Sequence, residues 1–223
     1  MNPLSAEKTE SRLKDTLISD PRIHNINSKK GRIAKRIFDI AVSSLALVAF
    51  PIILIPAAIS IKLTSKGPVF YRQLRTGRNG RTFLCYKFRT MRNDANDLPV
   101  RRNDPRVTTV GRIMRKTSID ELPQIINVFL GQMSLVGPRP HMVTHTLFYQ
   151  SIIRDYNRRL AVKPGITGLA QISGYRGATD RPSKMQRRID ADLAYIETWS
   201  PWLDIKIILR TVANIIHGEE NAY

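Results

Sequence analysis

Two adjacent carboxylates, Asp120 and Glu121, are the residues whose types and spacing best fit chemistry in this sequence. They stand at the predicted start of a helix, and three cations, Arg112, Arg115 and Lys116, come just before them. In one interpretation they are capping acids, because carboxylates at a helix N-terminus are favoured by the helix dipole. In the other they form a site for phosphate chemistry, in which one carboxylate attacks a phosphoryl group and the other binds a divalent cation. The residues alone leave both interpretations open.

Cations in rigid or strand-flanking positions are candidates for binding phosphate. The segment Gly137-Pro138-Arg139-Pro140 is a stiff turn that presents one arginine, and a guanidinium held in this way suits bidentate phosphate recognition. Lys87 and Arg89 follow a predicted strand and could contact nucleotide phosphates or lipid headgroups. A structural loop and a solvated basic face explain the same residues equally well. The four histidines show no spacing typical of a metal site, and no Walker A, GxGxxG or GxSxG pattern occurs.

The composition of the 223-residue chain narrows its class of partners. Its 36 Lys and Arg residues against 18 Asp and Glu give a net charge of +18, which favours nucleic acid, an anionic membrane surface or phosphorylated substrates. Residues 62–118 alone contain 15 basic residues and three acids. A single cysteine, Cys85, excludes an internal disulfide framework and a cysteine-based structural zinc site. Composition does not choose among the three partner classes.

The elements that must position these residues begin with an apolar segment. Residues 40–61 form a run of 22 residues without a charge, and a helix of that length, about 33 Å, would reach across a bilayer. Pro51 at its centre and Pro56 one turn later kink or end a helix. Basic residues flank both ends, which places both on the cytoplasmic side of a membrane. We therefore expect a re-entrant hairpin broken at Pro51, rather than a straight span or a buried soluble helix.

Beyond this run the chain has the character of a soluble domain built from short elements. Strand-like segments at 68–73 and 82–88 are joined by a turn that contains Asn79-Gly80, a hairpin signal. The spacing of Leu122, Ile125, Ile126 and Phe129 predicts a helix that ends at Gly131. We expect a loop at 131–140, turn and strand at 163–177, and two helices at 183–216 that separate near 199–202. The last helix fits an amphipathic core helix or one that lies at a membrane interface, and the apolar run nearby favours the interface.

Four motifs follow one another along most of the chain. They are KRIFDIAVSSLAL (35–47), GPVFYRQLRTGRNGRTFLCYKFRTM (67–91), DPRVTTVGRIMRKTSIDELPQIINVFLGQMSLVGPRP (104–140) and VKPGITGLAQISGYRG (162–177). In this order they resemble the bacterial sugar transferase family, the small monotopic phosphoglycosyl transferases that begin capsule, exopolysaccharide and glycan assembly. The resemblance covers roughly residues 33–216. It departs from the family at Phe50, because members commonly have a serine before the helix-breaking proline, where its hydroxyl can satisfy freed backbone groups.

The resemblance implies a fold and a location. The fold would be that of an α/β monotopic membrane protein with a re-entrant helix hairpin, a small strand-containing catalytic domain and interfacial amphipathic helices. Its parts would be a flexible basic tail at 1–30, the hairpin at 31–66 and a catalytic domain at 67–223. The location would be the cytoplasmic face of the bacterial inner membrane. Phosphorylated substrates then account for the net charge, so no nucleic acid is expected as a partner, and a homo-oligomer is left open.

The resemblance also implies a reaction. A sugar-1-phosphate would pass from a UDP-sugar donor to undecaprenyl phosphate, with release of UMP and a requirement for Mg2+. Asp120 would be the nucleophile of a ping-pong mechanism with a covalent phosphosugar intermediate, and Glu121 together with Asp120 would hold the metal. Binding of phosphate or substrate would involve Lys87, Arg89, Arg115, Arg139 and Asp192.

Two questions stay open after the resemblance. Residues 174–202 resemble members that use plain hexoses, UDP-glucose or UDP-galactose, more than members that use N-acetylated sugars. The alternative to catalysis is a silent membrane scaffold of the same fold, with a membrane-tethered nucleic-acid-binding protein as a more distant reading.

Overall fold

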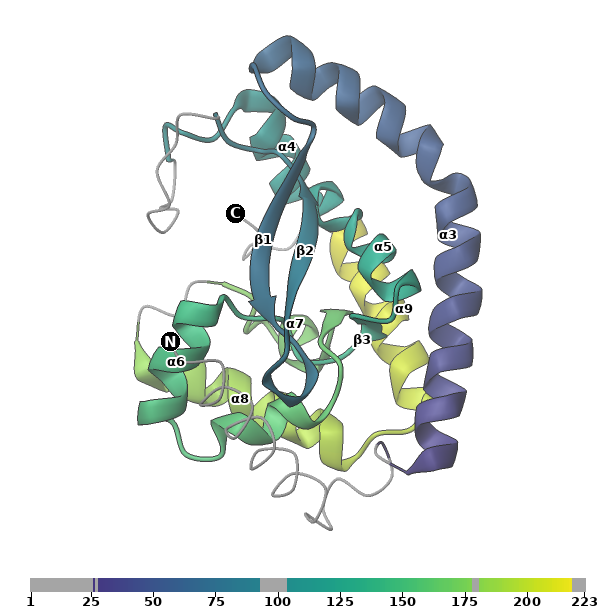
Figure 1. The fold of residues 1–223 in the computed structure, drawn as a ribbon, viewed down its shortest axis with the longest axis vertical. Helices are drawn as coiled ribbons and strands as arrows, with labels where there is room; N and C mark the ends of the chain where they lie inside the picture. The colour runs from purple at the N-terminus through teal and green to yellow at the C-terminus, as the bar shows by residue number, and fades with distance from the viewer. Residues whose placement is uncertain (1–25, 27, 93–103, 178–180, 218–223) are drawn as a thin grey trace.

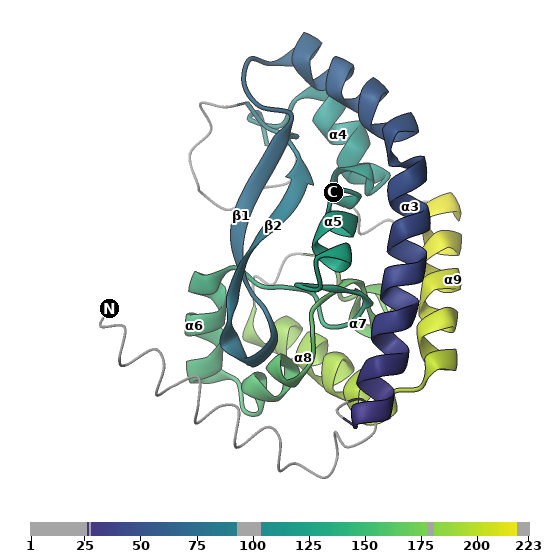
Figure 2. The same cartoon turned by 45° about the vertical axis from the view of Figure 1, so that its right-hand side comes forward.

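The structure, a computed structural model, describes residues 26, 28–92, 104–177 and 181–217 of the chain. Most of the tail expected at 1–30 therefore lies outside the described residues. A long helix, α3 (Lys29–Thr64), forms one flank of the molecule, and a two-stranded hairpin runs through its middle (Figure 1). Shorter helices fill the space between and below them, with α9 (Pro201–His217) running beside α3 (Figure 2).

Helix α3 is continuous through both of its prolines. It begins behind Ser28, whose side chain accepts a hydrogen bond from the backbone N–H of Gly31 at 3.0 Å, and it contains Pro51 and Pro56. The sequence predicts two helices with a break at Pro51, whereas the structure has one helix that bends in its second half (Figure 1). A proline removes one backbone hydrogen bond, but its fixed φ is compatible with a helix, so the loss can appear as a bend. The predicted break is thus replaced by curvature.

The bend is packed against the hairpin by an aromatic contact. Phe50 is buried and stacks on Phe88, with ring centroids 6.1 Å apart, and Phe70 stacks on the same ring at 5.6 Å. The residue that departs from the family pattern therefore attaches the centre of α3 to the domain. Ser43 donates to the carbonyl of Ile40 at 3.3 Å, within its own turn, so it does not satisfy the carbonyl group that Pro51 frees.

The hairpin confirms the strand and turn predictions. Strands β1 (Phe70–Thr76) and β2 (Thr82–Phe88) pair antiparallel, with Thr76 opposite Thr82. The turn between them includes the short 3-10 helix η2 (Arg78–Gly80), in which Asn79 and Gly80 have φ of 56° and 80°. Asn and Gly are the residues that adopt this left-handed region most easily, which is why the pair signals a hairpin.

The remaining elements alternate between short helices and short strands. In chain order they are α4 (Thr109–Lys116), η3 (Ile119–Glu121), α5 (Gln124–Phe129), β3 (Ser134–Val136), α6 (Val143–Ile152), η4 (Tyr156–Ala161), β4 (Gly165–Thr167), α7 (Leu169–Ile172), α8 (Pro182–Glu197) and α9. The helix predicted to end at Gly131 and the two predicted C-terminal helices are confirmed. Strand β3 lies inside the expected loop and pairs parallel with β4, and helix α7 occupies part of the segment expected as turn and strand.

The main core lies where α5, β3, η4, α8 and α9 meet. Its least exposed members include Val128, Met133, Val136, Ile189 and Ile207, each with 0% exposed. Asn127 connects this core to the hairpin, because its side chain accepts from the N–H of Tyr86 at 3.0 Å and donates to the carbonyl of Leu84 at 2.7 Å. These contacts fix β2, which leads to Lys87, against α5, which follows the carboxylate pair.

Helices α3 and α9 each expose apolar side chains. They include Ile37, Val48, Ile52 and Leu63 of α3, and Trp202, Leu209 and Ile216 of α9. Helix α3 is long and apolar enough to cross a membrane, and only 17% of its most apolar stretch is buried inside the protein. A core helix of a soluble protein would be mostly buried, so this surface suits association with a membrane. The interfacial position of α9 stays a prediction.

Candidate active site

The carboxylate pair lies in a tight turn between two helices. Asp120 and Glu121 end η3, and both residues are buried, with 8% and 6% exposed. Ser118 enters the turn with φ of 59°, in the left-handed region, and Pro123 caps the start of α5. The pair therefore sits one turn before the helix rather than in its first turn, because proline lacks an N–H and readily starts a helix. Among the described residues neither carboxylate accepts a hydrogen bond from a backbone N–H, so the capping interpretation has no support.

Glu121 is held by three cations. Arg139 forms a bidentate ion pair with it, with Nη1 2.9 Å from Oε2 and Nη2 2.6 Å from Oε1. The ammonium of Lys87 lies 2.7 Å from Oε1, and a guanidinium nitrogen of Arg176 lies 3.6 Å from Oε2. Burial alone would raise the pKa of Glu121, but Arg139 and Lys87 outweigh burial and hold the pKa well below its usual range. This side chain is ionised at neutral pH.

Asp120 has the opposite environment. No hydrogen bond or ion pair joins its carboxylate to another residue in the part of the chain that the structure describes. Burial raises the pKa of Asp120 above its usual value; the nearby charge of Lys87 opposes this rise, and that of Glu121 adds to it. The pKa values of these two adjacent residues are thus shifted in opposite directions. Glu121 is fixed in ion pairs, and Asp120 has no partner among the described residues.

Two further predicted arginines lie at different distances from this pair. Arg115 donates from Nε to the hydroxyl of Thr90 at 2.9 Å, and its charge lowers the pKa of Asp120. Arg89 instead turns toward the end of α3, where it donates to the carbonyl and the hydroxyl oxygen of Ser65 at 2.7 and 3.0 Å. Its Nε and Nη1 are buried and have no hydrogen-bond partner among the described residues. The structure thus places Arg115 beside the pair and Arg89 at the helix end.

Asp192 is not in contact with the carboxylate pair. It is paired with Arg159 at 2.8 Å, and both side chains are only 2% exposed. Arg159 also donates to the backbone carbonyl of Arg139 at 2.6 Å. Burial raises the pKa of Asp192, with Arg159 opposing that rise. Asp192 is thus linked to the Arg139 loop through Arg159, and its part in binding phosphate or substrate stays a prediction.

The loop that carries Arg139 is fixed on several sides. A Cβ on Gly137 would lie 2.6 Å from the carbonyl oxygen of Lys163, so only glycine lets the loop lie this close to the chain before β4. On the other side Arg75 donates to the carbonyl of Pro140 at 3.1 Å. A rigid loop keeps the guanidinium of Arg139 aimed at Glu121.

Three arginines of the site were not predicted from the sequence: Arg75, Arg159 and Arg176. Nothing local separates them from the other members of the 36 basic residues, since each acts through a contact distant in sequence. A signal existed for Arg75, which lies in the second family motif, and for Arg176, which lies in the fourth, but not for Arg159.

The site offers few ligands for a metal ion. In the described residues no group of three or more His, Cys, Asp and Glu side chains could hold a metal. Mg2+ is commonly bound by one or two carboxylates together with water and substrate phosphates. Asp120, with its unpaired carboxylate, fits such a site, whereas the oxygens of Glu121 are already shared with Lys87 and Arg139. Of the two carboxylates, Asp120 is therefore the freer ligand.

Fold and site together define a class of protein. A small α/β domain carries a long apolar helix on its flank, and a carboxylate pair surrounded by arginine and lysine lies on that domain, as phosphate chemistry at a membrane requires. The bacterial sugar transferase family matches residues 30–218, and the chain belongs to that family.

Several characterised relatives share much of this sequence. The UDP-glucose:undecaprenyl-phosphate glucose-1-phosphate transferase of Klebsiella pneumoniae is 54% identical over 181 residues, 80% of this chain and 39% of the relative. The protein of the same name from Caulobacter vibrioides is 48% identical over 85% of this chain and 72% of its own length. The exopolysaccharide production protein PSS of Rhizobium leguminosarum bv. phaseoli is 44% identical over 82% of this chain and 94% of its own length. The chain thus spans about two fifths of the Klebsiella relative and most of the other two.

Proposed function

We propose that this chain transfers glucose-1-phosphate from UDP-glucose to undecaprenyl phosphate and releases UMP. Family membership and the names of two relatives support the reaction, and the name of a third supports a place in exopolysaccharide assembly. The observation that carries the proposal is the contrast within the carboxylate pair. Glu121 is paired with cations, while Asp120 has no partner among the described residues. Two titratable groups whose environments separate their pKa values can take different chemical roles.

Asp120 acts as the nucleophile in this proposal. One of its carboxylate oxygens attacks the phosphorus that bears the sugar, and the bond from that phosphorus to the oxygen bridging the two phosphates breaks, so that UMP leaves. In the second half-reaction a phosphate oxygen of the acceptor attacks the same phosphorus and breaks its bond to Asp120. The carboxylate is regenerated, which gives ping-pong kinetics. Attack needs the ionised form of Asp120, and its raised pKa makes the rate sensitive to mild acid.

The cations around Glu121 prepare the site for a diphosphate. Arg139, Lys87 and Arg176 lie on one side of the pair, and their charges favour an anionic donor next to Asp120. Glu121 holds these side chains in place before substrate arrives. When bound, Mg2+ would be held by Asp120 and Glu121 and would offset the negative charge between the donor phosphates.

The membrane arrangement that we propose is re-entrant and monotopic, on the cytoplasmic face of the bacterial inner membrane. Both ends of α3 are joined to the same domain: Lys35 forms an ion pair with Asp204 of α9 at 2.7 Å, and Ser65 accepts from Arg89. A straight crossing would put these ends on opposite sides of the bilayer, which one domain could not bridge. A bent helix with an apolar outer surface can instead dip into one leaflet and return (Figure 1).

Cysteine labelling tests this topology. The exposed Lys30 and Lys66 flank the apolar run and are replaced by cysteine one at a time, while the wild-type chain, whose Cys85 is buried, gives the background. In sealed inverted vesicles both variants should react with a membrane-impermeant maleimide. Reaction of only one of them would exclude the re-entrant arrangement.

Release of UMP tests the reaction. The purified chain is supplied with Mg2+, undecaprenyl phosphate and, in turn, UDP-glucose, UDP-galactose and an N-acetylated UDP-sugar. We expect release with UDP-glucose, reduced by Asp120→Asn about 1,000-fold or more, as for loss of a nucleophile. Asp155→Asn is the matched control, because Asp155 is exposed and has φ of 62°, which asparagine tolerates.

Each result has a separate meaning. Release with UDP-galactose in place of UDP-glucose would keep the reaction and change the sugar. Release that survives Asp120→Asn would remove the assigned nucleophile. No release with any donor would favour a silent scaffold of the same fold.

A further inference from the structure

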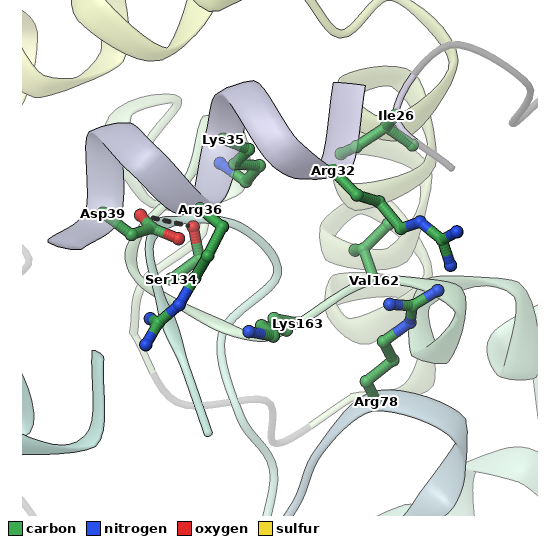
Figure 3. A pocket seen from close by; sticks show the side chains of 9 residues that line it. All are labelled: Ile26, Arg32, Lys35, Arg36, Asp39, Arg78, Ser134, Val162 and Lys163. Carbon is green, nitrogen blue, oxygen red and sulfur yellow. Dashed lines mark hydrogen bonds between the residues drawn. The ribbon is translucent and has the colours of Figure 1, made fainter. Parts of the chain in front are cut away.

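A second charged site lies at the start of α3, apart from the carboxylate pair. It is a cavity of about 110 Å³ lined by Ile26, Arg32, Lys35, Arg36, Asp39, Arg78, Ser134, Val162 and Lys163 (Figure 3). None of these residues contacts Asp120 or Glu121 in the ion pairs described above. We call it the basic cavity, because five of its nine residues are Lys or Arg and one is an acid.

Several charges of the basic cavity are already partnered. Lys35 is paired with Asp204 at 2.7 Å, and Arg36 donates to the carbonyls of Val128 and Phe129 at the end of α5 at 2.7 and 2.8 Å. The acid, Asp39, accepts from the hydroxyl of Ser134 and the N–H of Leu135, each at 2.9 Å. Arg78 donates from Nε to the carbonyl of Ala161 at 3.0 Å. These contacts hold the walls of the cavity in place.

Two cations of the basic cavity have no partner among the described residues. The side chains of Arg32 and Lys163 form no hydrogen bond or ion pair with any residue that the structure describes. Arg32, from α3, and Arg78, from the hairpin turn, extend their guanidinium groups toward one another, with Lys163 to one side of them (Figure 3). Burial lowers the pKa of Lys163, and the charges of Arg36 and Arg78 lower it further, against a smaller opposing effect of Asp39. Like charges held together in this way favour an anion between them.

The position of the cavity suits an anion at the membrane surface. Arg32, Lys35, Arg36 and Asp39 follow helical spacing and share the inward face of α3, while Ile33 and Ile37 on the outward face are 50% and 64% exposed. The apolar run begins at residue 40, so the cavity lies where the helix would meet the lipid headgroups. Phosphate is the anionic group of that layer.

We propose that the basic cavity binds a phosphate group through Arg32, Lys163 and Arg78, supplied either by the headgroup of a membrane lipid or as a free phosphate. This site is separate from the one that carries out the transfer, and the proposal does not depend on that reaction. A bound phosphate would accept charge-assisted hydrogen bonds from the two unpartnered cations and would fix the start of α3 relative to β4 and the hairpin turn.

Calorimetric titration of the full chain in an uncharged detergent tests the proposal. The probes are short-chain phosphatidylglycerol, whose phosphate is part of a lipid, and inorganic phosphate, which is free. The double variant Arg32→Gln/Lys163→Gln should bind the successful probe at least about tenfold more weakly, because it loses two hydrogen bonds to a charged group. Lys163→Arg should keep most of the affinity. Lys206→Gln, which removes an exposed charge from α9, is the matched control and should bind within twofold of wild type.

The two probes separate the sources of the phosphate. Binding of the lipid alone assigns the cavity to a headgroup, and binding of inorganic phosphate as well assigns it to phosphate in general; both outcomes support the site. The proposal is overturned if neither probe binds at millimolar concentration, or if the double variant binds as well as wild type. It is also overturned if Lys206→Gln loses as much affinity as the double variant, because binding would then follow net charge alone.

Discussion

The carboxylate pair and the basic cavity both bring acids and cations together, but they leave opposite charges without a partner. Each region contains several cations and a buried acid: Glu121 is paired with its cations, whereas Asp39 accepts from Ser134 and Leu135 beside them. Around the pair the acid Asp120 is left without a partner, whereas in the cavity the cations Arg32 and Lys163 are left. The group left without a partner is thus negative in one place and positive in the other.

This difference indicates which chemistry each site can carry out, which the net charge alone does not. A charge of +18 indicates only that the partners are anionic. An unpartnered carboxylate beside cations can attack a phosphorus, whereas unpartnered cations can only bind phosphate. The carboxylate pair keeps a buried acid without a partner, and the basic cavity keeps a half-buried cation, Lys163, without one. Each lowers the free energy of unfolding, which is a usual feature of functional sites.

After the loss expected for Asp120→Asn, the largest expected effect comes from breaking the ion pair between Glu121 and Arg139. Arg139→Gln removes the bidentate partner of Glu121, and release of UMP should fall about 100-fold or more, because a group aimed at developing charge is lost. Arg139→Lys keeps the charge without the planar fork and should give an intermediate loss. The measurement is the initial rate of UMP release at saturating Mg2+.

The exposed Arg154 provides the control for this series. Arg154→Gln removes an equal charge outside the site and should leave the rate unchanged. Full activity in Arg139→Gln would mean that the fixed pairing of Glu121 has no part in the reaction.

The next effect separates positioning from metal binding at Asp192. Asp192→Asn breaks an ion pair whose side chains are both 2% exposed, and the free energy of unfolding should fall by about 3 to 5 kcal/mol. Thermal unfolding measures this loss. The Mg2+ concentration for half-maximal UMP release should stay within twofold of wild type, because Asp192 contacts Arg159 and not the pair.

A second substitution checks that the loss arises from the broken pair. Asp192→Asn combined with Arg159→Gln leaves no unpaired buried charge and should recover part of the stability. A tenfold rise in the Mg2+ requirement of Asp192→Asn alone would instead place this residue at the metal site.

The sequence predicted those elements that depend on the conformational preference of one or two neighbouring residues. Asn79-Gly80 fixes the hairpin, and Gly131, with φ of 81°, follows α5, because both depend on backbone conformations that few residues adopt. The outcome at Pro51 was not predictable in this way. A proline removes one backbone hydrogen bond, but whether the helix continues past it depends on packing. Here Phe50 packs on Phe88, which is distant in sequence. Strands β3 and β4 have three residues each, too few to show a period.

The same limit applies to the site. Asp120, Glu121, Lys87 and Arg139 were predicted to act together, and the structure brings them together. Arg89 and Asp192 were grouped with them by the family resemblance, yet their partners, Ser65 and Arg159, could be known only from the fold. The sequence around a basic residue does not show which residue it contacts in the fold. In a chain this rich in arginine, the few arginines that form the site therefore cannot be told from the others by sequence alone.

A smaller effect measures how far the unpartnered carboxylate of Asp120 lowers the free energy of unfolding. Because the folded pKa of Asp120 is raised, the folded state holds its proton more tightly, and the free energy of unfolding falls as pH rises from about 3.9 through the folded pKa. Asp120→Asn mimics the protonated form and should unfold a few degrees higher than wild type at pH 7.5. The gain should vanish near pH 4, and Asp155→Asn should show none. A variant less stable than wild type at pH 7.5 would contradict an unpartnered carboxylate.

The smallest effect is the matching measurement in the basic cavity. Lys163→Gln removes a half-buried cation that Arg36 and Arg78 repel, so without phosphate the variant should unfold about 1 to 2 °C higher than wild type. The difference should shrink in 1 M NaCl, because salt screens the repulsion, and it should reverse when a bound phosphate stabilises only the wild type. Lys206→Gln, which removes an exposed charge from α9, should unfold with wild type at both salt concentrations. A Lys163→Gln variant less stable than wild type in low salt would mean that this lysine already has a partner, and the cavity would then lack the free positive charge that sets it apart from the carboxylate pair.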